Sequence, residues 1–383
     1  MRLRGNPRLK FLDRRILGGM IRLFCGVKGK PRIRRAPRSV LLVKLNALGD
    51  TLLFLAIARI LKREFPGVRV DFLGSEINRP ILERSTRLDQ VRHLRLARIF
   101  THPHELVSLI REIRRADYDV LIDGSQWERI TALIALFSGA GVTIGFDTPG
   151  HSNRAGAFHF AMPHRREAHE IDCFFDLLKP LGVQTEEEDR FGEYFVIEED
   201  RRRLKEQDLP KPPWVVFHPG CGAHGLPRQW SAEKFAELGE SLKKLHPEVS
   251  ILLTGNGSEG RICAQVQEIA PQAVLDFSNR LSFPVLAALL ERSSLLVSGN
   301  TGVMHLAAAL QTPQVALHGP TDPNRWGPLN PNAVVVQSPK SCAPCLYLGD
   351  EYQCDCPDCM EEIGVNAVLD VCCRLLRQIR GEV

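Results

Sequence analysis

From Ser39 onward the chain alternates short apolar runs with longer amphipathic stretches. Runs rich in Val, Ile and Leu, such as Val40–Val43 and Val120–Asp123, are typical of buried strands. The stretch Leu52–Phe65 between the first strand and a further strand at Val68–Leu73 has the pattern of a helix. Strands that alternate with helices predict an α/β unit with a parallel sheet.

A second α/β unit is expected after a change in composition near Glu186. The segments Glu186–Arg190 and Glu198–Arg203 are dense in charge, and Lys211-Pro212-Pro213 closes the segment, which indicates a linker. Strands at Trp214–Phe217 and Ser250–Leu253 then frame a helix near Ala232–Leu245. The predicted organisation is an arm at residues 1–38, a domain at 39–195, a linker at 196–212, a domain at 213–340, and a Cys-rich segment with a terminal helix at 341–383.

The arm holds most of the positive charge. It carries thirteen Lys or Arg and one acid, Asp13, which gives +12, so the rest of the chain carries −7 of the formal net charge of +5. The body is therefore acidic, and the composition does not favour nucleic acid as a partner of the whole chain.

Helical spacing of apolar residues between Phe11 and Phe24 in the arm, with Arg and Lys among them, suits a helix lying on an anionic membrane. A disordered basic tail and an RNA-binding arm are the alternatives. Arg22 interrupts the apolar stretch Ile16–Val27, which argues against a signal peptide. The longest apolar runs are too short to span a bilayer.

Candidate chemistry lies in the loops after strands, where open α/β sheets bind ligands. The first strand runs into Lys44 and then Gly49-Asp50, at the start of an apolar helix. Asp50 has two interpretations, a helix N-cap or a general base that takes a proton from an attacking hydroxyl. Lys44 and Gly49 would lie on the same side of the ligand cleft that is expected between the two α/β domains.

Two glycine-rich loops follow strands of the second unit. The segment His218–Gly225 precedes Arg228, which could neutralise phosphate charge, although a structural turn with a surface arginine explains the same residues. The segment Thr254–Ser258 precedes Glu259, which either reaches a ribose hydroxyl or belongs to a simple strand-to-helix turn.

A third loop, Asn300-Thr301-Gly302, opens a helix that contains His305. Its backbone N–H groups would lie at a helix amino terminus, where partial positive charge favours a diphosphate. His305 is interpreted either as a donor to a phosphate oxygen or as a capping or packed histidine.

Four separated motifs in one order resemble glycosyltransferase family 9, the lipopolysaccharide heptosyltransferases. They are Gly49-Asp50, His218-Pro219-Gly220 with Arg228 and Trp230, Asn300-Thr301-Gly302 with His305 and Ala307–Ala309, and Gly319-Pro320-Thr321. The resemblance covers about Val40–Trp326. It implies the GT-B fold, in which two Rossmann-like domains face each other across a cleft, with the acceptor held mainly by the first and a sugar nucleotide mainly by the second.

The resemblance also implies roles for single residues. Asp50 would be the catalytic base, with Lys44 and Gly49 on the acceptor side. The donor-binding residues would be Arg228, Glu259, Asn300, Thr301, Gly302 and His305. The implied reaction is inverting, needs no metal, and moves heptose from ADP-heptose to a lipopolysaccharide core or related lipid-linked acceptor. The enzyme would be cytoplasmic and peripheral to the inner membrane.

Two departures bear on the donor. Family members usually carry Asp where this chain has Asn300, and some place a hydroxyl residue where it has Ala223. An alternative is therefore transfer of another nucleotide sugar, such as a hexosamine, to an envelope glycan. Two further alternatives are a non-catalytic sugar-nucleotide-binding protein and a metal-dependent redox protein.

Eleven cysteines without an export signal argue against a disulfide framework. Two CxxC pairs can supply four thiolates to a tetrahedral zinc, and an iron–sulfur centre is less favoured. The alternative is a Cys-rich loop whose thiols are reduced and bind no metal. The predicted ligands of a structural zinc are Cys342, Cys345, Cys356 and Cys359.

Overall fold

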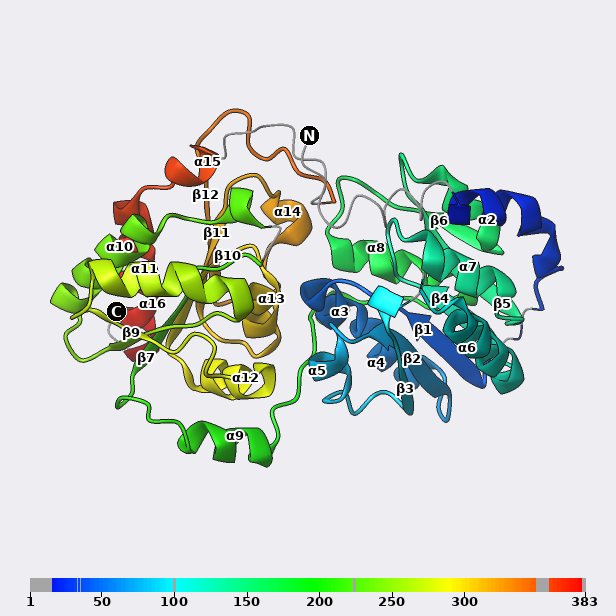
Figure 1. Cartoon of the computed structure of the whole chain (residues 1–383), viewed down its shortest axis with the longest axis horizontal. Helices are drawn as coiled ribbons and strands as arrows, with labels where there is room; N and C mark the ends of the chain where they lie inside the picture. The colour runs from blue at the N-terminus through cyan, green and yellow to red at the C-terminus, as the bar shows by residue number, and fades with distance from the viewer. Residues whose placement is uncertain are drawn as a thin grey trace. The chain divides into compact units, whose positions relative to one another are not determined.

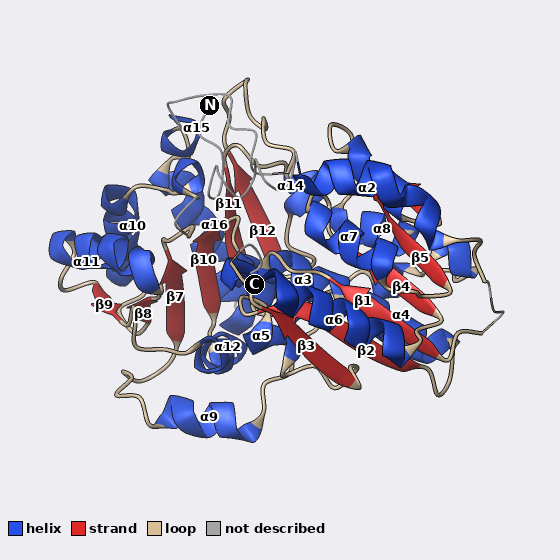
Figure 2. Ribbon diagram, turned by 45° about the vertical axis from the view of Figure 1, so that its right-hand side comes forward, coloured by secondary structure: helices blue, strands red, loops and turns tan. Residues whose placement is uncertain are grey.

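The computed structural model describes residues 16–32, 34, 36–98, 101–222, 225–348 and 358–380. The chain divides between Glu193 and Tyr194 into two compact units. Each unit contains one six-stranded sheet in which every strand pair is parallel, and helices lie against its strands (Figures 1 and 2). Both expected α/β units are thus present.

The sheet of the N-terminal unit has the order β3-β2-β1-β4-β5-β6. Its strands are β1 (Ser39–Val43), β2 (Arg69–Ser75), β3 (Gln90–Leu94), β4 (Val120–Asp123), β5 (Val142–Asp147) and β6 (Phe160–Pro163). Its α-helices are α2 (Gly18–Phe24), α3 (Leu48–Phe54), α4 (Ala56–Glu64), α5 (Arg79–Leu82), α6 (Pro103–Ala116), α7 (Arg129–Phe137) and α8 (Glu170–Asp176).

The sheet of the C-terminal unit has the order β12-β11-β10-β7-β8-β9. Its strands are β7 (Trp214–His218), β8 (Ser250–Leu253), β9 (Val274–Asp276), β10 (Leu295–Gly299), β11 (Gln314–His318) and β12 (Ala333–Gln337). Its α-helices are α9 (Glu198–Lys205), α10 (Ala232–Leu245), α11 (Gly260–Ile269), α12 (Phe283–Arg292), α13 (Gly302–Ala309), α14 (Pro323–Trp326), α15 (Asp358–Glu361) and α16 (Val365–Arg380).

The described part of the arm differs from the expectation. Leu17 and Ile21 are buried in the apolar core of the N-terminal unit, which α7 also lines. The guanidinium of Arg22 donates to Asn153 Oδ1 at 2.8 Å, and Lys28 Nζ donates to the carbonyl oxygen of Phe158 at 2.6 Å. Residues 16–32 are therefore part of the folded unit rather than a separate arm, because their apolar side is needed by the core. Residues 1–15, which include the start of the expected helix at Phe11, lie outside the described residues.

The expected linker, residues 196–212, is partly folded. It contains α9, whose Leu204 is buried and whose Arg201 forms an ion pair with Glu291 of α12 at 2.8 Å. The charge-dense sequence that suggested a linker is thus the solvent face of a short helix packed on the C-terminal unit. Among the described helices, none is both long and apolar enough to cross a membrane.

Candidate functional site

Asp50 lies in the first turn of α3, where the negative carboxylate faces the positive end of the helix dipole. The N-cap of this helix is Ala47, so the interpretation of Asp50 as an N-cap is wrong. Its side chain is 13% exposed, and Oδ2 lies 3.3 Å from Nζ of the fully buried Lys44. The expected helix at Leu52–Phe65 begins earlier, at Leu48, and is interrupted at Leu55 between α3 and α4. This earlier start brings Gly49 and Asp50 into the helix.

Gln126, which follows β4, joins this group. Its Nε2 donates to Asp50 Oδ2 at 3.0 Å and to Glu170 Oε1 at 2.7 Å, while its Oε1 accepts from Lys44 Nζ at 3.0 Å. The sequence prediction missed Gln126 and Glu170. The available signal was that a polar segment, Gly124–Gln126, follows a recognised strand at the sheet edge where Lys44 also lies.

A second carboxyl beside this group is protonated more readily than usual. Glu128 is buried, and burial raises the pKa of its carboxyl against the opposing influence of Lys44. Asn46 Nδ2 donates to Glu128 Oε1 at 3.2 Å.

In the C-terminal unit the predicted donor residues gather at the carboxyl ends of neighbouring strands. Arg228 lies after β7, and its Nη1 donates to the backbone oxygen of Asn300 at 3.0 Å. Thr301 is the N-cap of α13, and its hydroxyl accepts from the N–H of Met304. The first N–H groups of a helix have no acceptor within the helix, so those of Gly302 and Val303 can bind an anion beside the Arg228 guanidinium.

Asn300 is a buried side chain whose amide Nδ2 donates to the carbonyl oxygen of Trp326 at 3.0 Å. A carboxylate at this position would have no proton to donate and would face a carbonyl oxygen. The Asn therefore ties the loop after β10 to α14 in a way that Asp would not. His305 is also buried, in the second turn of α13.

Glu259 supports the loop after β7. Its two carboxylate oxygens accept from the N–H of Gly222 at 2.8 Å and of Asn256 at 3.0 Å. Gly220 permits this approach, because a Cβ there would lie 2.6 Å from the Glu259 side chain. The carboxylate is 16% exposed, and each of its oxygens has a second lone pair that can accept from a ribose hydroxyl. Contact of Glu259 with a ribose stays a prediction. Ala223 lies outside the described residues.

His318 ends β11 beside the loop Gly319-Pro320-Thr321. Burial lowers the pKa of His318 from 6.5 to about 4, and its Nδ1 lies 3.3 Å from the carbonyl oxygen of Thr321. The folded C-terminal unit therefore keeps this imidazole neutral at pH values where the unfolded chain binds a proton.

Acidification is expected to destabilise the C-terminal unit through His318. Because its folded pKa lies below the unfolded value, the stability that it contributes is lost as pH falls from about 7 toward 4. The loss should reach about 3 kcal/mol at the acidic end, at roughly 1.4 kcal/mol per pKa unit. Urea unfolding at a series of pH values, followed by Trp fluorescence, measures it. The His318→Gln variant should show a flatter pH dependence, and equal slopes in both proteins would disprove this assignment.

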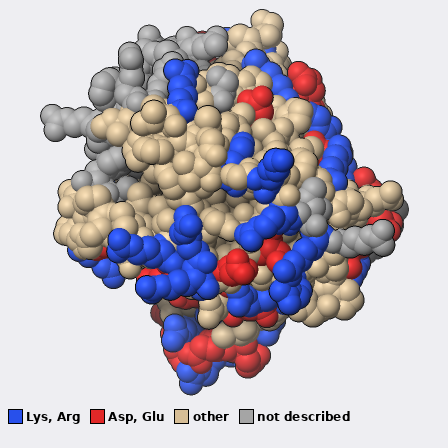
Figure 3. Space-filling model, turned by 90° about the vertical axis from the view of Figure 1, so that its right-hand side faces the viewer, with Lys and Arg blue, Asp and Glu red and all other residues tan. Residues whose placement is uncertain are grey.

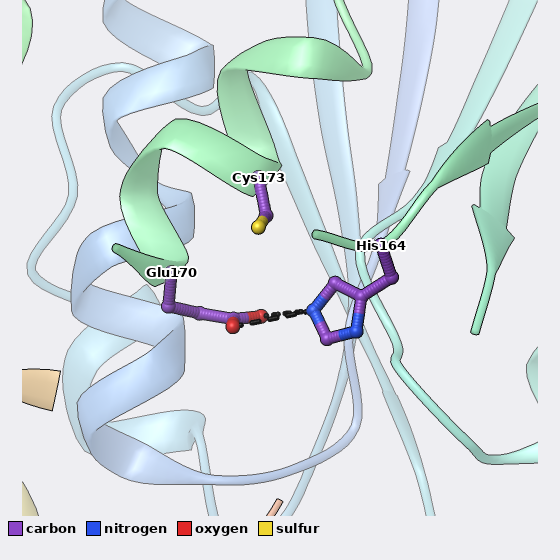
Figure 4. A group of neighbouring side chains, drawn as sticks. All are labelled: His164, Glu170 and Cys173. Carbon is purple, nitrogen blue, oxygen red and sulfur yellow. Dashed lines mark hydrogen bonds and ion pairs between the residues drawn. The ribbon is translucent and has the colours of Figure 1, made fainter. Parts of the chain in front are cut away.

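The predicted zinc site is only partly within the described residues, because Cys356 lies outside them. Cys342 is exposed, Cys345 is half-buried, and Cys359 is buried close to Gly319. In the part of the chain that the structure describes, the group of three potential ligands that lie close together is His164, Glu170 and Cys173. These three side chains, none of them expected from the sequence as ligands, are all buried in the N-terminal unit (Figure 4).

Comparison with known proteins matches residues 106–355 to the family model of glycosyltransferase family 9 (heptosyltransferase). The chain is 26% identical over 301 residues to lipopolysaccharide heptosyltransferase 3 of Escherichia coli, covering 75% of this chain and 84% of that protein. It is 28% identical over 335 residues to lipopolysaccharide heptosyltransferase 1 of Pseudomonas aeruginosa, covering 82% and 88%. The structure of E. coli ADP-heptose lps heptosyltransferase II has a similar fold, with a TM-score of 0.71 and 21% identity over 89% of this chain and 99% of that one.

Proposed function

Because the chain belongs to glycosyltransferase family 9, we propose that it transfers heptose from ADP-heptose to a lipopolysaccharide core acceptor. The chain is a glycosyltransferase of the heptosyltransferase type. The observation that carries the proposal is Asp50, a carboxylate in the first turn of α3 whose Oδ2 is held by Lys44 and Gln126. The relatives from E. coli and P. aeruginosa are heptosyltransferases, which supports heptose as the sugar.

The proposed reaction is a single displacement that inverts the anomeric carbon. The acceptor hydroxyl gives its proton to Asp50 Oδ1 as its oxygen bonds to the anomeric carbon of the donor, and the bond from that carbon to the phosphate oxygen breaks. ADP leaves with the electron pair of the broken bond. The basis for Oδ1 is that, within the described residues, Lys44 and Gln126 both bind the other oxygen.

Charge that develops on the leaving diphosphate would be met by Arg228 and the amino terminus of α13. Fixed positive groups of this kind can replace a divalent cation at a leaving phosphate, so we propose that the reaction needs no metal. Glu259 and His305 complete the proposed donor site, the first toward the ribose and the second toward a phosphate oxygen.

A panel of nucleotide sugars tests the donor. ADP-heptose at about 100 times its dissociation constant should stabilise the protein by about 2.7 kcal/mol, a rise in Tm of about 5 to 10 °C. A uridine diphosphate hexosamine should give a smaller shift. The Arg228→Ala variant should lose most of the shift, because its phosphate contact is gone. The Arg201→Ala variant, which changes an exposed ion pair on α9, should keep it. Absence of a shift with every nucleotide diphosphate would contradict the proposal.

We also propose that the N-terminal unit rests on an anionic membrane, where a lipid-linked acceptor is held. The outward side of the segment 16–32 exposes Leu23 (76%) and Val27 (57%), together with Ile16. Exposed cations follow at Lys30 and Arg32. Figure 3 shows one face of the molecule, on which Lys and Arg are spread among neutral and acidic side chains. Exposed apolar side chains with cations close by in the sequence suit the headgroup region of a bilayer.

Liposome binding tests this surface. The Leu23→Ser, Val27→Ser double variant should bind vesicles containing phosphatidylglycerol several-fold more weakly than the wild type, with the Tm shift by ADP-heptose unchanged. Point variants are preferable to deletion of the segment, since deletion would also remove core residues Leu17 and Ile21. Leu245→Ser, a change at a 60% exposed leucine of the other unit, is the control and should bind normally. Equal binding by the double variant and the wild type would refute the membrane surface.

A further inference from the structure

Gln126 connects two carboxylates in the interior of the N-terminal unit. The side chain is fully buried, and all three of its polar contacts are charged groups: Lys44, Asp50 and Glu170. Because Lys44 can only donate and carboxylates accept, the amide oxygen must face Lys44 and the nitrogen must face the two carboxylates. The orientation of this amide is thereby fixed by its surroundings.

The far end of this network is a contact between a histidine and a carboxyl group. His164 Nε2 lies 3.1 and 3.2 Å from the two oxygens of Glu170, and both side chains are fully buried (Figure 4). The ring of His164 also packs against Phe146, with centroids 4.7 Å apart. The pair joins His164, which directly follows β6, to Glu170, the first residue of α8. A buried carboxyl group needs hydrogen-bond partners of this kind.

A metal is a weaker interpretation of the same cluster. Cys173 lies near the pair, but its thiol is 3.4 Å from the carbonyl oxygen of Arg165, to which it donates. Glu170 already accepts from Gln126 at 2.7 Å, and Gln126 in turn binds the cationic Lys44. Positive and donor groups that already surround a carboxylate disfavour a further cation there.

We propose that Gln126, held in orientation by the Glu170–His164 pair, is a positioning residue for Asp50. It binds Oδ2 together with Lys44 and so leaves Oδ1 as the atom that receives the acceptor proton. This inference rests on the proposed role of Asp50 as the base and adds a second layer of residues that set its geometry. Without Glu170, the Gln126 amide nitrogen loses one of its two acceptors, so its position against Asp50 is held less firmly.

The charged and titratable groups around Asp50 are Lys44 from β1, Glu128 after β4, and the pair Glu170 and His164 reached through Gln126. Removal of the Gln126 amide takes one donor away from the ionised form of Asp50 and leaves Lys44 in place. The acid limb of the pH profile of kcat/KM should therefore move to higher pH. A residue with a merely structural role would lower activity without moving this limb.

The test measures ADP release from ADP-heptose with heptose-deficient lipopolysaccharide as the acceptor. Gln126→Ala should lower kcat about 10- to 100-fold, the factor for one hydrogen bond to a charged group, with KM for the donor within about twofold. The nearly isosteric Glu170→Gln should act in the same direction and guards against loss of folding in the first variant. Cys173→Ala, on the same helix as Glu170, is the matched control and should keep the wild-type kcat and pH profile.

A double-mutant comparison separates this inference from the proposed function. In an Asp50→Asn background, Gln126→Ala should cause no further loss, because the group that it positions is gone. Inactive Asp50→Asn with fully active Gln126→Ala and Glu170→Gln would overturn the positioning role alone. Wild-type activity in Asp50→Asn would overturn the base and the positioning role together. Loss of activity in Cys173→Ala with a stoichiometric metal in the wild type would replace the inference with a metal site.

Discussion

Replacement of Asp50 by Ala is expected to lower kcat about 100- to 10,000-fold, the range for loss of a general base. The donor should still bind, because Arg228 and the start of α13 belong to the other unit. The measurement is steady-state ADP release, paired with a Tm shift by ADP-heptose. Asp50→Asn should be equally impaired, since an amide has the shape of the carboxylate but does not take up the proton.

The control for this variant is Glu112→Ala, which removes an exposed carboxylate from α6. It should leave kcat unchanged. Transfer at the wild-type rate by Asp50→Ala would remove Asp50 from the mechanism, whatever the donor proves to be.

The largest expected effect on stability is at the buried pair of Asp123 and Arg154. Both side chains are fully buried, and Arg154 Nη2 donates to Asp123 Oδ2 at 2.6 Å. Asp123→Ala would leave the guanidinium uncompensated in the core and should destabilise the N-terminal unit by about 3 to 5 kcal/mol. The same carboxylate accepts from the N–H of Ser125, so the segment that carries Gln126 should also loosen. Urea unfolding followed by circular dichroism measures the loss.

Two controls define this effect. Glu83→Ala breaks an exposed pair with Arg79 on α5 and should change stability by less than about 0.5 kcal/mol. The double change Asp123→Leu, Arg154→Met should be less damaging than Asp123→Ala alone, since no buried charge remains unpaired. A single variant as stable as the wild type would show that the pair does not hold this unit together.

Local sequence patterns predicted well those helices and strands whose apolar and polar positions depend on the element alone. The expected strand Val120–Asp123 and helix Ala232–Leu245 have the same bounds in the structure. The sequence pattern predicted a helix that begins at Leu52, whereas α3 begins at Leu48. The earlier start was missed because Leu48 and Gly49 give a weak apolar pattern and Ala47 is an unusual N-cap. The packing of residues 16–32 on the N-terminal unit was not predicted, since a helix that packs on a folded unit has the same amphipathic pattern as one that lies on a membrane.

The sequence predicted those residues of the candidate site that lie close together along the chain. Lys44 and Asp50 lie on either side of the short loop between β1 and α3 and could be recognised together. Gln126 and Glu170 are 44 positions apart, and their contact exists only because β4 and α8 are brought together by the fold. The role of Asn300 in binding the Trp326 carbonyl oxygen likewise depends on a contact between distant segments, 26 positions apart.

The most direct test of the proposed function is the transfer of heptose itself. Purified protein is incubated with ADP-heptose and heptose-deficient lipopolysaccharide in the presence of a chelator, and the acceptor is analysed by mass spectrometry. We expect the acceptor to gain one heptose while ADP is released, and Asp50→Ala to yield neither product. An acceptor of unchanged mass, with ADP-heptose bound but intact, would contradict it and identify a protein that binds the sugar nucleotide without transferring it.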